Sequence, residues 1–139
     1  MVIEKKYKKI VKSGKRKTSV ARTVITAGTG KVTINGEGYG SLHMFDKLKI
    51  AEPIKIAEHV LGKLDFDCEI NARGGGEKSQ IDAARLALAK AIVEFSSSKE
   101  LEKAYLAYDR NLLVADIRRK EANKPGDSKA RSMRQSSKR

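Results

Sequence analysis

The sequence predicts an α+β domain, a small β-sheet with helices packed on one face, followed by an extended basic tail. Residues 65–73 (DFDCEINAR) alternate apolar and polar side chains, which is typical of a strand with one buried and one wet face. Residues 79–95 carry an apolar stripe at helical spacing, and Ser79 with Asp82 resembles a capping box at the helix start. Residues 117–139 have almost nothing to bury and cannot fold unaided.

Two further strands are predicted near the N-terminus. Residues 18–26 (TSVARTVIT) are β-branched and largely alternating, and residues 31–36 (KVTING) form the second strand. The glycines of the AGTG segment between them favour a tight turn. We therefore expect these two strands to pair with each other as a hairpin.

Two more helices complete an expected order of β-β-α-β-α-α. Apolar side chains recur at helical spacing through residues 46–61, where Pro53 is expected to start or break the helix and Gly62 to end it. Residues 99–108 (KELEKAYLAY) predict a shorter helix. This order places the helices together on one side of a single sheet.

The positive charge of the chain is concentrated at its two ends. The 139 residues carry a formal net charge of +13, and the sequence pI is near 9.9. Residues 1–22 contain nine Lys or Arg and one acid, residues 118–139 contain nine and two, and residues 23–117 contain twelve and fourteen. An excess of this size indicates a polyanionic partner, with nucleic acid the leading candidate and an anionic membrane the other.

This distribution divides the chain into a basic N-terminal arm (residues 1–12), a globular domain (13–116) and the basic tail (117–139). The N-terminus lacks the uninterrupted apolar run of a secretion signal, and no apolar stretch reaches 18 residues, so we expect a soluble, cytoplasmic protein. The single cysteine, Cys68, cannot form an internal disulfide, which suits a reducing compartment.

Motifs for enzymatic chemistry are weak. GKRKTS (14–19) superficially resembles a phosphate-binding loop, but Lys9 and Arg16 occupy positions where that motif needs Gly and Ser or Thr. A basic strand edge lying on phosphates is the better interpretation. GEGYG (36–40) is a turn rather than a dinucleotide site, and Cys68 lies on an inner strand face with no ligand at metal spacing. We predict no enzyme, metal or cofactor.

The three glycines at 74–76 join a predicted strand to a predicted helix start. Arg73, Lys78 and the free amides of the first helical turn all lie near this loop, and glycine lets a backbone approach a phosphate or sugar edge closely. The sequence therefore predicts an anion contact here, with a flexible connector as the alternative.

Three stretches resemble one protein family. SGKRKTSVARTVITAGTGKVTING, GGGEKSQIDAARLALAKAI and YDRNLLVADIRRKE, with a terminal SKR, are similar to the S-nine family of small-subunit ribosomal proteins. YDR followed by LLVAD and RR resembles the archaeal and eukaryotic branch, and the archaeal side in particular. The resemblance runs from about Ser13 to Arg139. Ile117 and the final SSKR depart from the pattern common in that branch, which has Pro and Ser-Tyr-Arg.

This resemblance implies a fold like the second domain of ribosomal protein S-five, with an unusual left-handed βαβ crossover. It implies a structural constituent of the small ribosomal subunit that binds rRNA in the head, beside neighbouring head proteins. Its tail would reach the anticodon stem-loop of P-site tRNA, which Ser137, Lys138 and Arg139 would contact. The rRNA-binding groups expected from the resemblance and the charge pattern are Lys15, Arg16, Lys17, Arg22, Arg73, Gly74, Gly75, Gly76, Lys78, Arg110, Arg118, Arg119, Lys120, Lys129, Arg131 and Arg134.

Two alternatives remain at this point. Related folds occur in small-molecule kinases, although no acid and base pair stands out here. A nonspecific nucleic-acid or membrane binder would share the charge but would not explain the glycine loop at a helix start.

Overall fold

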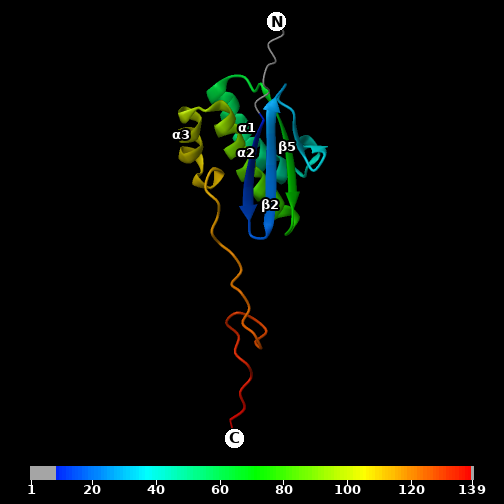
Figure 1. The fold of residues 1–139 in the computed structure, drawn as a ribbon, viewed down its shortest axis with the longest axis vertical. Helices are drawn as coiled ribbons and strands as arrows, with labels where there is room; N and C mark the ends of the chain where they lie inside the picture. Colours follow the sequence, from blue (N-terminus) through cyan, green and yellow to red (C-terminus); the bar gives the residue numbers. More distant parts are fainter. Residues whose placement is uncertain (1–8, 139) are drawn as a thin grey trace.

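The computed structural model describes residues 9–138 and has a five-stranded sheet and three α-helices (Figure 1). Short 3-10 turns lie at Tyr39–Ser41 and Arg110–Leu112. The strands and helices follow one another as β1 (Ile10–Arg16), β2 (Ser19–Ala27), β3 (Val32–Ile34), β4 (Glu37–Gly38), α1 (Met44–Leu61), β5 (Phe66–Arg73), α2 (Glu77–Ser96) and α3 (Lys99–Tyr108). The α+β class predicted from the sequence is confirmed.

The sheet has the order β1-β2-β5-β3-β4, and this order corrects the predicted hairpin. β5 lies between β2 and β3, antiparallel to the first and parallel to the second, so β2 and β3 do not pair. β2 forms its hairpin with β1 instead, through a turn at Lys17 and Thr18. β5 lies at the centre of the sheet, where both of its edges are paired, and its Phe66, Cys68 and Ile70 side chains are buried.

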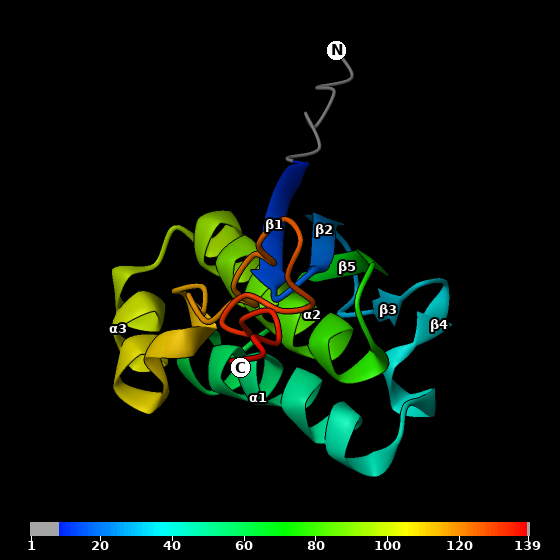
Figure 2. The same cartoon turned by 90° about the horizontal axis from the view of Figure 1, so that it is seen from below.

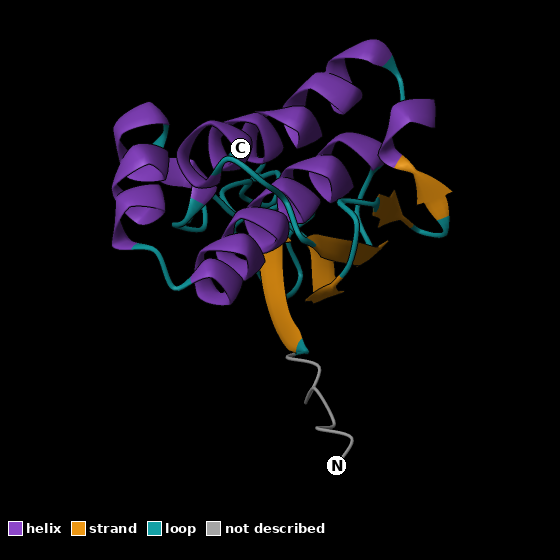
Figure 3. Cartoon of the chain, turned by 90° about the horizontal axis from the view of Figure 1, so that it is seen from above, coloured by secondary structure: helices purple, strands orange, loops and turns teal. Residues whose placement is uncertain are grey.

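All three helices lie on the same side of the sheet (Figures 2 and 3). α2 packs directly on β1, β2 and β5, and α1 packs against α2 and α3. The approach of α2 to β1 is close enough that a side chain at Gly14 would collide with the backbone of Ala83. The fully buried Ile70, Leu88 and Ile92 fill the space between sheet and helix.

The helix boundaries differ from prediction at two places. α1 runs unbroken through Pro53, which is buried and whose carbonyl accepts a hydrogen bond from the Tyr105 hydroxyl at 2.7 Å. A proline inside a helix costs about 3 kcal/mol, so the burial of this face must outweigh that cost. α2 begins at Glu77, which places Ser79 at the third helical position rather than at the cap. Gly62 ends α1 as predicted, with φ of 79°.

The globular part begins with β1, and α3 is its last α-helix. β1 begins at Ile10, so the first strand includes the last residues of the segment assigned to the N-terminal arm, whose residues 1–8 lie outside the described residues. After Arg110–Leu112, residues 113–138 contain no helix or strand and lead away from the domain (Figure 1).

Candidate nucleic-acid interface

Cations of the β1–β2 turn and of the tail start lie together at one end of the molecule. Lys15 and Lys17 line the same hollow as Arg118, Arg119 and Lys120, although about a hundred residues separate the two groups. The Arg119 guanidinium donates to the Lys17 carbonyl at 3.1 Å, which fixes the tail start on the turn. This is a single cationic surface built from two distant segments of sequence.

The surface continues onto the face of the sheet that carries no helix. Val20 is opposite Lys15 on β1 and opposite Arg73 on β5, so these side chains point to the same face. Arg22 lies two residues along β2 and shares that face. Lys15, Arg22 and Arg73 are exposed, and they extend the basic surface across three adjacent strands.

The glycine loop is rigidly packed against the β1–β2 turn. Gly74 and Gly75 have φ of 79° and 61°, and side chains there would meet the Thr18 carbonyl and the Ser19 hydroxyl. The buried Ser19 hydroxyl donates to the Gly74 carbonyl at 2.7 Å and lies 2.6 Å from the Ser79 hydroxyl. These hydrogen bonds tie the exposed loop to β2 and to the start of α2, which favours an ordered loop over a flexible connector.

Several of the predicted rRNA-binding cations pair with intramolecular carboxylates, and Lys78 and Arg16 differ in how far such a pair encloses them. The Lys78 ammonium contacts the buried Asp46 carboxylate at 3.0 Å, while its side chain stays 67% exposed. It can therefore reach a further anion without leaving its partner. Arg16 is enclosed instead, with its side chain only 17% exposed and its guanidinium between Asp82 and Asp116.

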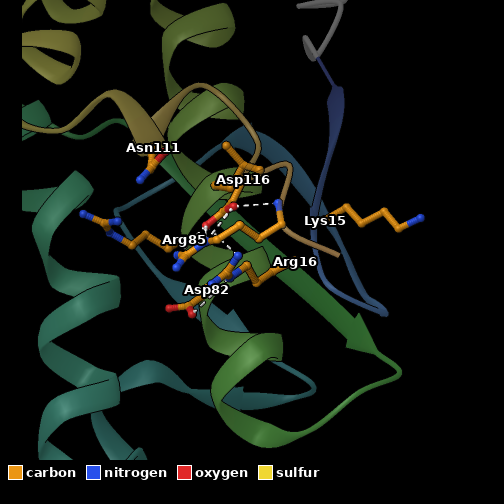
Figure 4. Close-up of a pocket in the computed structure, with 8 residues that line it drawn as sticks. Lys15, Arg16, Asp82, Arg85, Asn111 and Asp116 are labelled. Atoms are coloured by element: carbon orange, nitrogen blue, oxygen red, sulfur yellow. Dashed lines mark hydrogen bonds and ion pairs between the residues drawn. The ribbon is translucent and has the colours of Figure 1, made fainter. Parts of the chain in front are cut away.

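Figure 4 shows the pocket around Arg16, in which Lys15 points away from the cluster. Arg16 Nη1 lies 2.6 Å from Asp116 Oδ2, and Arg118 donates to the same carboxylate from its backbone amide, Nε and Nη2 at 2.7–3.2 Å. These Arg118 hydrogen bonds lower the pKa of Asp116 from 3.8 to about 2, with smaller contributions from the two positive charges. Sequence reasoning missed this acid, although a lone Asp two residues before an Arg-Arg pair is a usable signal.

The remaining tail cations are exposed and lie apart from the turn. Arg131 pairs with Glu121 at 2.8 Å, and Arg134 donates to the Gly126 carbonyl at 3.1 Å, so residues 121–134 fold back on themselves. The other predicted contacts, Arg110, Lys129, Ser137 and Lys138, are exposed as well, whereas Arg139 lies outside the described residues.

Metal binding, cysteine reactivity and membrane crossing can each be compared with the described residues. No group of three His, Cys, Asp or Glu side chains within residues 9–138 could hold a metal ion. Burial raises the pKa of the Cys68 thiol to about 12, so this cysteine is a neutral core residue. Within the same range, none of the helices has the length and apolar character needed to cross a membrane.

Comparison with known proteins decides the family. The family model described as ribosomal protein S9/S16 matches residues 14–139, which is nearly the whole chain. The chain belongs to the ribosomal protein S9/S16 family. The resemblance seen in the sequence is thus confirmed, and with it a structural, non-enzymatic protein rather than a small-molecule kinase.

Three similar curated proteins come from archaea, in agreement with the archaeal and eukaryotic branch that the YDR and LLVAD motifs indicated. The small ribosomal subunit protein uS9 of Methanococcus vannielii is 46% identical over 116 residues, covering 83% of this chain and 85% of the relative. The protein of the same name from Picrophilus torridus is 45% identical over 130 residues, covering 92% and 96%. That from Pyrobaculum aerophilum is 38% identical over 138 residues, covering 96% and 94%.

Proposed function

We propose that this chain is a structural constituent of the small ribosomal subunit in the cytoplasm, and that it binds rRNA in the head beside neighbouring proteins. The observation that carries the proposal is the cationic surface on which Lys15, Arg22 and Arg73 of three strands meet the start of the tail. Backbone phosphates bind such a surface with release of counterions, which makes the affinity depend steeply on salt. The names of the archaeal relatives support the same role.

The glycine loop and Lys78 are proposed to extend the rRNA contact around α2. The loop backbone at 74–76 is exposed and rigid, so it can approach a phosphate or ribose without a further ordering cost. Arg16 is left out of the proposed contacts because its guanidinium already lies between two carboxylates.

The tail is proposed to pass along rRNA and to place Ser137, Lys138 and Arg139 on the anticodon stem-loop of P-site tRNA. Residues 118–139 could span on the order of 70 Å at roughly 3.3 Å per residue if they were fully extended. The fold at 121–134 rests on an exposed ion pair and on an exposed hydrogen bond from Arg134, and an exposed ion pair contributes only about 0–1 kcal/mol. Contacts between Arg131 or Arg134 and phosphates could therefore replace it readily.

The rRNA part is tested by binding of the full chain to a transcript of the 3′ major domain of small-subunit rRNA. The triple variant Lys15→Gln, Arg22→Gln, Arg73→Gln should bind more weakly, and its salt slope should fall by about 0.7–0.9 for each phosphate that is no longer neutralised. A control variant, Lys55→Gln, Lys63→Gln, Lys103→Gln, removes the same charge from exposed positions elsewhere. Equal losses of affinity in the two variants would refute a localised interface.

The tail part is tested by deletion of residues 137–139. The truncated chain should fold and enter small subunits as the full chain does, while its subunits retain P-site tRNA less well on a filter. Unchanged tRNA retention would contradict the tail's role and leave the rRNA interface unaffected.

A further inference from the structure

Asp116 is an acid that lies beside the proposed rRNA interface, between Arg16 and Arg118. Its side chain is 16% exposed and faces Arg16 from β1 (Figure 4). It also contacts Arg118 from the tail. Lys15 and Asn111 line the same small pocket. An acid in this place subtracts charge from a phosphate-binding surface, so its presence there needs a reason other than RNA affinity.

The contacts of Asp116 join the domain to the tail. Arg16 belongs to the last position of β1 and is held from the other side by Asp82 on α2, with Nε 3.9 Å from the carboxylate. Arg118 is the first tail cation and binds the same Asp116 carboxylate with its backbone and its guanidinium. The carboxylate therefore connects the sheet and α2 to the tail start.

A second contact nearby limits the direction in which the tail leaves. The Arg119 guanidinium donates to the Lys17 carbonyl in the β1–β2 turn at 3.1 Å. Two attachment points three residues apart, at Asp116 and Arg119, fix the chain between them over the turn. The five cations of the hollow repel one another, so without the carboxylate the tail start would move away from the turn.

We propose that Asp116, held by Arg16, is a positioning residue that clamps the tail start onto the β1–β2 turn. The clamp preorganises turn and tail cations into one phosphate-binding surface and sets the direction of the tail. This inference rests on the proposed rRNA-binding function. It adds that Arg16 binds Asp116 within the protein instead of contacting RNA. Preorganisation raises affinity because the ordering cost of the tail start is met during folding rather than during binding.

The clamp itself is tested on the free full-length protein by ¹⁵N relaxation. Backbone amides 118–120 should show heteronuclear NOE values close to those of β2, and Asp116→Asn should lower them to the values of residues 135–138. Arg118→Gln, at a side chain 77% exposed and so harmless to folding, should lower the values at 119 and 120 as well. Values that stay high in both variants would overturn the proposal.

Its functional consequence is tested with the same 3′ major domain transcript. Asp116→Asn removes a negative charge, so electrostatics alone predicts tighter binding, whereas loss of the clamp predicts binding weaker by about threefold or more. Glu121→Gln is the matched control, because it removes one negative charge from an exposed tail position. It should bind as tightly as the wild type or more tightly.

The outcomes separate the two proposals. Tighter or unchanged binding of Asp116→Asn, with amides 118–120 made mobile, would overturn the preorganised surface. Weaker binding by Asp116→Asn but not by Glu121→Gln would support it. If the wild-type chain fails to bind the transcript, the proposed function is refuted, and the relaxation data alone then decide whether the clamp exists.

Discussion

The Ser19 hydroxyl is a small group whose removal tests the rigid glycine loop. Ser19 is fully buried at the start of β2, and its hydroxyl joins the strand to the loop and to α2. Ser19→Ala deletes one oxygen without changing backbone conformation or leaving a large cavity. Its effect therefore reports the hydrogen bonds of this group and little else.

The size of the stability loss depends on which hydrogen bonds the partners of Ser19 keep. Without Ser19 the Gly74 carbonyl still accepts from Gln80 Nε2 at 3.1 Å, and the Ser79 hydroxyl still contacts the Gly76 carbonyl at 2.9 Å. Neither partner is left unsatisfied, so the larger penalty of a buried unpaired group does not apply. The loss should be about 1–2 kcal/mol in the free energy of unfolding, or roughly 3–7 °C in Tm for a chain of this length.

Urea unfolding followed by circular dichroism measures this loss, with Ser13→Ala as the control. Ser13 lies on the exposed face of β1, so its replacement should change stability by no more than about 0.5 kcal/mol. The slope of free energy against urea should stay constant in both variants. If Ser19→Ala were as stable as Ser13→Ala, the hydroxyl would not hold the loop and the rigid-loop interpretation would be wrong.

Three further predictions concern packing, reactivity and pH. Gly14→Ala should cost about 1–3 kcal/mol in urea unfolding, because its side chain meets the α2 backbone, whereas Gly40→Ala should be neutral since that site is open. Cys68 should react with a thiol reagent at pH 8 only after unfolding; stoichiometric reaction of the native protein would contradict its burial. Because the folded pKa of Asp116 is about 2, below the ordinary 3.8, its stabilising contribution should be complete above about pH 4 and disappear toward pH 2; a carboxyl ¹³C shift midpoint near 4 would contradict this.

Elements with a clean hydrophobic period can be predicted from the sequence alone. Alternation in a half-buried strand is a local property, so residues 65–73 predict a strand, and β5 indeed buries Phe66, Cys68, Ile70 and Ala72. The same applies to the helix at 99–108, which coincides with α3. Such patterns record which face of an element is buried, whatever covers that face.

Strand pairing could not be predicted in the same way. Glycines between residues 18–26 and 31–36 favour a turn, but β5 displaces β3 from β2 by pairing with both strands. The true hairpin turns at Lys17 and Thr18, where Lys17 has φ of 52°. No Gly or Asn marks that turn, and the tertiary packing of Ser19 on the glycine loop outweighs local turn preference.

The candidate interface could likewise be predicted only in part from the sequence. Its cations can be found from composition, since charge excess at the two ends is visible without a fold. Which cations are available could not be predicted, because the availability of Arg16 depends on acids that are distant from it in sequence. Only the fold shows that Arg16 meets Asp116 and Asp82.

Ion pairs between α1 and α2 help to place the cations of the proposed interface. Between α1 and α2, successive pairs join Asp46 with Lys78, Lys49 with Asp82 and Glu52 with Arg85, so that two helices rich in charge pack side by side. Each pair keeps at least one side chain partly in solvent, which limits its contribution to stability. Their effect is geometric, because α2 begins at the glycine loop and its position fixes that loop beside the β1–β2 turn. Asp82→Asn should therefore weaken binding of the rRNA transcript, although Asp82 lies on α2, on the other side of the sheet from Arg22 and Arg73.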